Sequence, residues 1–266
     1  MTGTILEQIV ETKRREIAAA KASVSFASQE TAAGKAEPAR NFYDSVTLPG
    51  RTALIAEIKK KSPSAGLIRE PFDPVAIAQI YETNGAAALS VLTDRSYFAG
   101  DLSFIDAVKR KSSLPVLRKD FILEEYQVFE SRAAGADAIL LIAEILSGEK
   151  LQPLAELSQQ LGMATLIEIH DPANLPRVLP LISPDARTLL GINNRDLHAQ
   201  RTTLMTSFSL ARQLPQGVRF VAESGIQSRA DVQALSVAGA CAILVGETLM
   251  RADDIGAMVR ELLGGA

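Results

Sequence analysis

The chain has 266 residues and is 47% hydrophobic, so it is long and apolar enough to bury one large core. Its 28 basic and 31 acidic residues give a net charge of -3, which argues against nucleic acid as a partner. No apolar stretch reaches the roughly 18 residues of a membrane span. The single cysteine, Cys241, excludes an internal disulfide and is expected to pack in the core. We therefore expect a cytoplasmic protein that makes no contact with membranes.

Residues 1–50 precede the first predicted strand and are expected to form a helical extension. Charged and apolar residues alternate at helical spacing over residues 1–21, which predicts a long amphipathic helix. A short helix is predicted near residues 39–46. Residues 23–40 are small, polar and poor in large apolar side chains, so we predict a mobile linker between the two helices.

Eight apolar runs separated by helix-like segments are predicted to be strands. Gly85, Gly135 and Gly239 each stand between a helical segment and a strand, and they are candidate helix C-caps. Eight alternating units over residues 51–266 predict an α/β fold, a (β/α)8 TIM barrel with an N-terminal helical extension. The extension's long helix could cover the bottom of the barrel or lie beside the active site. The predicted strands are 54–58, 88–92, 115–119, 138–142, 165–169, 189–193, 219–223 and 242–246.

Ionisable side chains end several of these strands, at the carboxyl side where TIM barrels hold their active sites. Successive strand residues face opposite ways, so Glu57 and Lys59 share one face. Arg118 and Asp120 break this pattern on the third strand, and the sequence suggests no partner for them. An acid and a base on one barrel face predict a catalytic site. The same alternation directs further polar residues inward, namely Lys119, Glu168, Asn193 and Glu223.

A phosphate-binding signature follows the seventh and eighth strands, where barrels commonly bind phosphate. It consists of Ser224-Gly225 and Gly246-Glu247. Glycine lets the backbone approach a ligand closely, and a helix N-terminus favours negative charge. We expect backbone amides to bind the phosphate, with only the amide of Glu247 facing it, because the carboxylate of Glu247 would repel the ligand.

We expect neither a metal nor an organic cofactor. The two histidines, His170 and His198, are too few for a histidine-rich site and are interpreted as loop or capping residues. The chain has no nucleotide-binding glycine pattern. A magnesium site made only of carboxylates stays open.

Six stretches of the chain resemble the indole-3-glycerol phosphate synthase family, the ring-closing enzymes of tryptophan biosynthesis. The resemblance covers nearly the whole chain and implies a barrel with an N-terminal extension and no cofactor. It implies that 1-(2-carboxyphenylamino)-1-deoxyribulose 5-phosphate becomes indole-3-glycerol phosphate with loss of carbon dioxide and water. Other tryptophan-pathway enzymes are candidate partners. The stretches are ALIAEIKKKSPSAGLI, LSVLTDRSYFAGDLSFI, LPVLRKDFILEEYQVFESRAAGADAILLIA, LLGINNRDL, VAESGI and AILVGETLM.

The resemblance also implies catalytic roles for individual residues. Lys119 matches the general acid that protonates the substrate's carbonyl oxygen. Lys59 matches the lysine that holds the substrate carboxylate, and Glu168 matches the glutamate that stabilises the cationic intermediate. Glu57 and Asn193 are expected to orient the lysines and the substrate hydroxyls.

Further matches concern substrate binding. Ser62 is expected to add a hydroxyl to the phosphate site, and Arg195 to lie beside that site. Phe98 and Phe121 match positions that pack against the anthranilate ring. Glu247 departs from the small polar residues that are familiar at its position in the family.

Two other functions stay open on the residues alone. A strand-end lysine facing a ketose phosphate could form an imine, as in a Schiff-base aldolase or another sugar-phosphate lyase or isomerase. The second of these functions is that of a catalytically inactive barrel that serves as an interaction module. The intact set of Lys59, Lys119 and Glu168 argues against that module.

Overall fold

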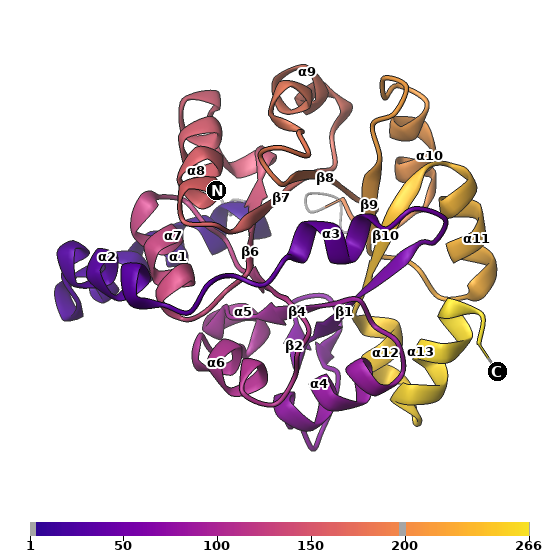
Figure 1. Ribbon diagram of the computed structural model, residues 1–266, viewed down its shortest axis with the longest axis horizontal. Helices are drawn as coiled ribbons and strands as arrows, with labels where there is room; N and C mark the ends of the chain where they lie inside the picture. The colour runs from indigo at the N-terminus through magenta and orange to yellow at the C-terminus, as the bar shows by residue number, and fades with distance from the viewer. Residues whose placement is uncertain (1–3, 197–200, 266) are drawn as a thin grey trace.

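The computed structural model describes residues 4–196 and 201–265, and Figure 1 shows how their elements are arranged. Within these residues eight parallel strands close into a barrel in the order β1-β10-β9-β8-β7-β6-β5-β4. The predicted TIM barrel is confirmed, and each of its strands overlaps one predicted apolar run. The strands are β1 Ala53–Ile58, β4 Ala88–Leu92, β5 Val116–Lys119, β6 Ala138–Ile142, β7 Ala164–Ile169, β8 Thr188–Asn193, β9 Phe220–Glu223 and β10 Ala240–Val245.

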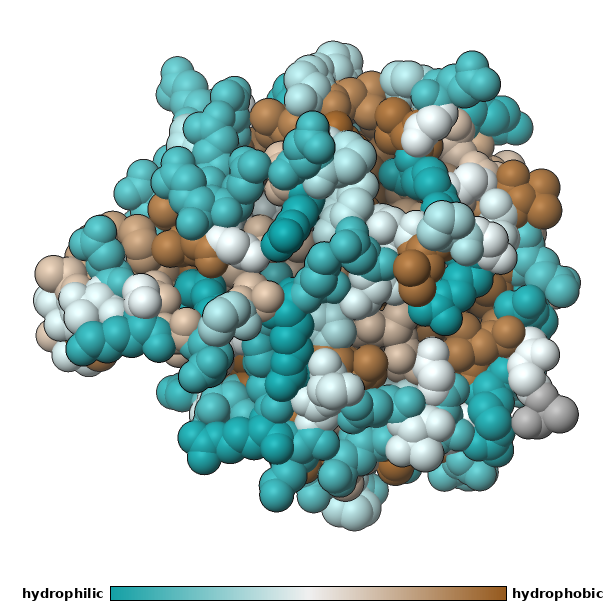
Figure 2. All heavy atoms as spheres, viewed as in Figure 1, coloured by the Kyte–Doolittle hydropathy of each residue, from teal (hydrophilic) through white to brown (hydrophobic). Residues whose placement is uncertain are grey.

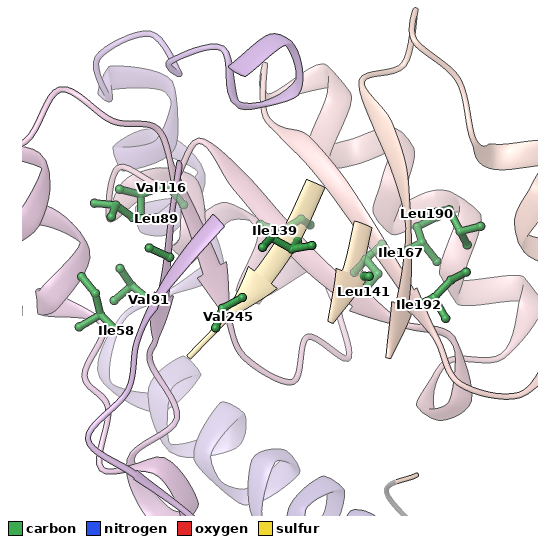
Figure 3. Packing of buried hydrophobic residues seen from close by; sticks show 14 of the residues in the cluster. Ile58, Leu89, Val91, Val116, Ile139, Leu141, Ile167, Leu190, Ile192 and Val245 are labelled. Carbon is green, nitrogen blue, oxygen red and sulfur yellow. The ribbon is translucent and has the colours of Figure 1, made fainter. Parts of the chain in front are cut away.

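Helices surround the barrel in Figure 1. Strand residues that face them, such as Ile58, Val91 and Ile167 in Figure 3, form one apolar layer with the helices. No helix in the described part of the chain is long and apolar enough to cross a membrane. The helices are α4 Pro74–Thr83, α5 Arg95–Phe98, α6 Ser103–Lys109, α7 Glu125–Ala133, α8 Gly148–Gln160, α9 Leu175–Val178, α10 Met205–Ala211, α11 Arg229–Val237, α12 Glu247–Arg251 and α13 Ile255–Leu263.

The connections between these elements follow the predicted glycines. Gly85, Gly135 and Gly239 directly follow the C-cap residues of α4, α7 and α11, with φ of 98°, 91° and 101°. Positive φ is the conformation in which glycine ends a helix, so the predicted C-caps are confirmed. The loop after β1 holds a small hairpin, β2 Lys61–Ser62 and β3 Gly66–Leu67.

The short predicted helix of the extension is confirmed as α3 Phe42–Thr47, and it closes the amino-terminal end of the barrel. Phe42 and Val46 are buried in the apolar cluster that fills the barrel, together with small residues such as Ala53 and Ala88 that begin strands. In Figure 1 this helix crosses in front of the barrel, and Figure 2 shows a largely hydrophilic outer surface around it. The bottom of the barrel is therefore plugged by α3.

The long helix α1 Ile5–Ser23 lies at the opposite end of the barrel. Its Lys13 Nζ lies 2.9 Å from Asp94 Oδ2 and 2.9 Å from Asp120 Oδ1. Those two carboxylates follow β4 and β5 at their carboxyl ends. Of the two positions left open by the sequence, α1 takes the one beside the active-site end.

The prediction of a mobile linker over residues 23–40 is wrong, because α2 Phe26–Lys35 occupies its centre. Ser25 caps this helix by accepting a hydrogen bond from the amide of Ser28. The Phe26 ring packs on α7, edge-on to Phe129 at 5.2 Å between ring centroids. The scarcity of large apolar side chains misled the prediction, since one aromatic side chain and one cap suffice to dock a short helix made of good helix formers.

A buried ionic network joins α1 to the barrel and supplies the partners that the sequence did not reveal. Arg118 Nη2 lies 3.0 Å from Asp120 Oδ2 and 2.9 Å from Glu130 Oε2, and its Nε donates to Thr93 Oγ1. Lys13 completes the network from α1. Burial works to raise the pKa of Asp120, but Arg118 and Lys13 outweigh it and hold that pKa well below its usual range.

We predict that Lys13→Met destabilises the protein by about 3–5 kcal/mol, because it removes the cation that pairs with buried Asp94 and one of the two that pair with buried Asp120. Lys21→Met is the matched control on the same helix, since the exposed ion pair of Lys21 with Glu124 is worth at most about 1 kcal/mol. Urea unfolding measures both changes. Equal losses in the two variants would show that the network does not anchor α1.

Candidate active site

A cavity of about 630 Å³ opens at the carboxyl ends of the barrel strands. Each of the eight strands contributes a lining residue, from Glu57 of β1 to Leu244 of β10. The cavity brings together nearly all of the residues that the sequence nominated. Among the predicted site residues, all of which are described, Ser62 alone is not part of the lining, and its hydroxyl accepts from the amide of Ala65. The lining includes Glu57, Lys59, Phe98, Lys119, Phe121, Glu168, Asn193, Arg195, Glu223, Ser224, Gly225, Gly246 and Glu247.

Lys119 stands between two buried carboxylates at the cavity floor. Its Nζ donates to Glu168 Oε2 at 2.7 Å and lies 3.2 Å from Glu223 Oε2. Asn193 Nδ2 donates to the other oxygen of Glu168 at 2.9 Å. These groups come from β5, β7, β8 and β9, so neighbouring strand ends of the closed barrel assemble them. The two carboxylates are 2% and 1% exposed, whereas the Lys119 side chain is 15% exposed, so the carboxylates are out of bulk water and the lysine reaches the cavity.

The electrostatics of this cluster follow from burial and like charge. Burial works to lower the pKa of Lys119, but Glu168, Glu223 and Glu57 outweigh it, so the pKa is raised and the lysine is a cation. Burial also works to raise the pKa of Glu168, yet Lys119 and Asn193 lower it below its usual value. Burial, together with the charge of Glu168, raises the pKa of Glu223 to about 8 against the effect of Lys119. At neutral pH the cluster therefore holds one cation, one carboxylate and one neutral carboxylic acid.

A second lysine and carboxylate pair lies on β1 and in the residue that follows it. Lys59 Nζ lies 2.5 Å from Glu57 Oε1, and both side chains are largely buried. Tyr81 of α4 donates its hydroxyl to the backbone carbonyl of Glu57, which fixes the end of this strand against the helix layer. The shared face predicted from strand alternation is confirmed, because both side chains line the cavity.

The predicted phosphate end of the cavity carries tight backbone turns. Ser224 and Gly225 follow β9 with φ of 66° and 77°. Positive φ is uncommon for a residue other than glycine and recurs where backbone groups are aimed at a ligand. Gly246 follows β10 and precedes α12. Both turns line the same cavity as the lysines.

Two arginines engage Glu247 at this end. Arg195 Nη2 lies 3.4 Å and Arg251 Nε 3.0 Å from its carboxylate, and Arg195 Nη1 donates to Ser64 Oγ at 2.7 Å. Burial works to raise the pKa of Glu247, but Arg251, Arg195 and Lys59 lower it. The sequence did not single out Arg251, because its place one helical turn after Glu247 looks like an ordinary surface pair.

Aromatic and aliphatic side chains form the other side of the cavity. The rings of Phe98 and Phe121 lie 6.1 Å apart, centroid to centroid. A smaller adjoining cavity of about 50 Å³ brings Leu6 and Ile9 of α1 against the same two rings. The sequence missed this contribution of the extension. A usable signal was Lys13, a lone charge within the apolar stripe of Leu6, Ile9 and Ile17.

No group of three or more histidine, cysteine, aspartate or glutamate residues in the described ranges could hold a metal ion. His170 Nδ1 lies 3.0 Å from the carbonyl oxygen of Asn193, and His198 lies outside the described residues. Cys241 is buried inside the barrel, where burial raises its thiol pKa to about 11. The cavity's ionisable groups are thus lysine, arginine and carboxylate.

Fold and site together define a TIM-barrel enzyme with buried lysine and carboxylate pairs at its catalytic mouth. A sequence model described as indole-3-glycerol phosphate synthase matches residues 6–262. The chain belongs to the indole-3-glycerol phosphate synthase family. Two relatives bear that name. One, from Rhodopirellula baltica, is 46% identical over 98% of this chain and 99% of its own, and one from Neisseria meningitidis is 47% identical over 97% and 98%.

Solved structures support the fold. The 3-hexulose-6-phosphate synthase of Salmonella typhimurium has a TM-score of 0.62 at 16% identity, covering 80% of this chain and 97% of its own. Tryptophan synthase subunit alpha of Legionella pneumophila has a TM-score of 0.59 at 17% identity, covering 84% and 96%. At these identities the likeness concerns the barrel alone.

We predict that the unfolding free energy of Glu223→Gln rises relative to the parent as pH increases from about 5 to 8. The raised pKa of about 8 means that folded Glu223 holds a proton which the unfolded chain has released, so the parent loses stability across this window. Glutamine has no such proton. Urea unfolding at several pH values measures the difference, with the exposed Glu149→Gln as control. A difference independent of pH would show that Glu223 is ionised throughout.

Proposed function

We propose that this protein converts 1-(2-carboxyphenylamino)-1-deoxyribulose 5-phosphate into indole-3-glycerol phosphate, a step of tryptophan biosynthesis. The observation that carries the proposal is Lys119, held as a buried cation at the cavity floor between Glu168 and Glu223. Family membership over residues 6–262 supports the same reaction. The cavity's combination of cations with an aromatic side suits an anionic substrate that carries a ring.

Ring closure begins at Lys119. The aromatic carbon that bears the carboxylate attacks the ketone carbon, and the ketone oxygen takes a proton from the Lys119 ammonium to become a hydroxyl. The raised pKa of Lys119 keeps that proton in place until substrate arrives. A positioned acid of this kind contributes roughly a hundredfold or more to the rate.

The remaining carboxylate and lysine groups serve the later steps. Lys59 holds the substrate carboxylate, which then leaves as carbon dioxide and restores electrons to the ring. Glu168 stabilises the cationic intermediate. Asn193 orients the Glu168 carboxylate through a 2.9 Å hydrogen bond. The new hydroxyl then leaves as water with a proton from Lys59, and Glu168 accepts the proton lost from the methylene carbon beside the nitrogen, which completes the indole. Glu57 orients Lys59 through their ion pair.

The two ends of the substrate fit the two ends of the cavity. Backbone amides of Ser224, Gly225, Gly246 and Glu247 bind the phosphate, and Arg195 lies beside it. Ser62 supports this loop region from outside the cavity lining. The anthranilate ring packs against the pair of phenylalanines, which are already 6.1 Å apart and tilted to each other.

Location and partners stay predictions. The even charge balance and the single cysteine favour the cytoplasm over an oxidising compartment. Other enzymes of tryptophan biosynthesis are the candidate protein partners, since they supply the substrate and consume the product.

A Schiff-base aldolase or isomerase is the second candidate, because Lys119 faces the cavity where a ketose phosphate would bind. Imine formation requires a neutral amine. The raised pKa of Lys119 opposes that form, so ring closure is favoured.

The direct test mixes purified protein with the carboxyphenylamino substrate and follows indole fluorescence, with and without a metal chelator. Indole formation unaffected by the chelator is expected. Borohydride is added in parallel to trap any imine. Trapped adduct without indole would establish the aldolase class, and absence of any product would leave an inactive interaction module.

We predict that Lys119→Ala lowers kcat roughly a hundredfold or more and leaves KM within about tenfold, because the lost proton acts in the transition state. Steady-state kinetics measure both constants, and circular dichroism checks the fold. Lys111→Ala, at an exposed position, is the control. Near-normal turnover of Lys119→Ala would overturn the acid assignment.

We predict that Glu247→Ser binds inorganic phosphate about two to five times more tightly, the effect expected from removing one partly exposed anion. The substitution frees Arg195 and Arg251 and keeps the backbone amide. Isothermal titration calorimetry measures the affinity. Glu261→Ser on α13 makes the same charge change at an exposed position. Strong loss of binding in Glu247→Ser alone would show that the carboxylate itself helps to bind the ligand.

A further inference from the structure

Two glycines at the catalytic mouth occupy backbone positions that other residues could adopt. Gly246 has φ of -123°, and Gly191 lies inside β8. Neither has a positive φ, so no turn requires glycine there. Glycine within regular structure costs roughly 0.5–1 kcal/mol relative to alanine. In strands it often marks a place where another group approaches closely.

The group that approaches Gly246 is the carboxylate of Glu57. A Cβ built on Gly246 would lie 2.1 Å from Glu57 Oε1 and 2.8 Å from its Cδ. Carbon atoms in proteins do not approach oxygen so closely, and Glu57 is 5% exposed with its oxygen engaged by Lys59. The carboxylate could therefore yield only by leaving its lysine.

Gly191 repeats this relation on the next pair of strands, β8 and β9. A Cβ there would lie 2.4 Å from Glu223 Oε1 and 3.2 Å from Leu166 Cδ1. Glu223 is 1% exposed and pairs with Lys119 at 3.2 Å. In both places a glycine, within β8 or directly after β10, faces a carboxylate that comes from the neighbouring strand.

We propose that Gly246 and Gly191 are positioning residues. Each absent side chain leaves the space in which one carboxylate reaches its lysine. The roles of those lysines rest on the proposed function, whereas the close approach of glycine and carboxylate does not. This assignment concerns the missing side chain of Gly246 and is separate from phosphate binding by its amide.

The two roles of Gly246 make different kinetic predictions. If its missing side chain serves Glu57, then Gly246→Ala displaces the carboxylate and lowers kcat by at least about tenfold, with KM within about threefold. If the glycine serves only the approach of phosphate, the same variant raises KM and weakens binding of inorganic phosphate. Gly148→Ala is the matched control, because a Cβ at Gly148 meets no atom within 4 Å.

Urea unfolding of Gly246→Ala, Glu57→Ala and the double variant tests the contact without substrate. Steric conflict predicts that Gly246→Ala destabilises the parent and has a clearly smaller effect in the Glu57→Ala background, where only the 3.1 Å approach to the Cβ of residue 57 is left. Gly191→Ala with Glu223→Ala repeats the cycle. Additive losses in both cycles would overturn the proposal. If Gly246→Ala fails to fold, the double variant is expected to fold, and failure of both also overturns it.

A shorter carboxylate at position 57 should partly restore the activity that Gly246→Ala removes, which a purely structural role of the glycine would not predict. In the Glu57→Asp background the carboxylate is one methylene shorter, so Gly246→Ala should lower kcat by less than it does in the parent. An equal or larger loss in that background argues against the assignment. If the parent protein forms no indole, the proposed function is wrong. The unfolding measurements on the single and double variants still decide the role of the glycines, because they do not depend on activity.

Discussion

Burial of the Lys119 ammonium is the constraint on which the rest of the site depends. An isolated cation out of water is costly, so the barrel must supply negative charge within ion-pair distance. Glu168 supplies it at 2.7 Å, and the carboxyl group of Glu223 lies 3.2 Å from the ammonium. Two carboxylates beside one lysine would overcompensate, and the raised pKa of Glu223 removes that excess. The cluster is therefore neutral as a whole while it keeps a proton on the lysine and another on a carboxyl group.

Barrel closure explains how so few residues achieve this. Parallel strands bring their carboxyl ends to one rim, and the register places Asn193 opposite Glu223 on neighbouring strands. Long side chains from several strands then converge on one point. A side chain on the neighbouring strand would collide with them there. The glycines of the rim relieve that crowding. A Cβ on Gly191 would reach the carboxylate of Glu223, so space at this rim is as limiting as charge.

The sequence predicted the barrel and most of the cavity because both follow from periodicity. Alternation along strands assigns Glu57, Lys119 and Glu168 to the interior without knowledge of the connections. Helix α2 was mistaken for a linker, since composition hides the aromatic contacts of Phe26 with Tyr126 and Phe129 that dock it. The closeness of Gly246 to Glu57 was also inaccessible. It depends on the stagger between two strands that are far apart in the chain, and sequence spacing carries no record of that stagger.

The two ends of the barrel hold the extension by different physics, and the cavity explains the difference. At the bottom, where the interior is filled, α3 buries Phe42 and Val46 against small strand residues. At the catalytic end the interior is open, so apolar contact alone offers α1 less surface. Ion pairs of Lys13 add to the apolar contacts of Leu6 and Ile9 there, and Asp120 also accepts the amide of Phe121 at 2.8 Å. The anchor of α1 is thus built into the segment that follows Lys119, and docking of the extension helps to shape the aromatic side of the site.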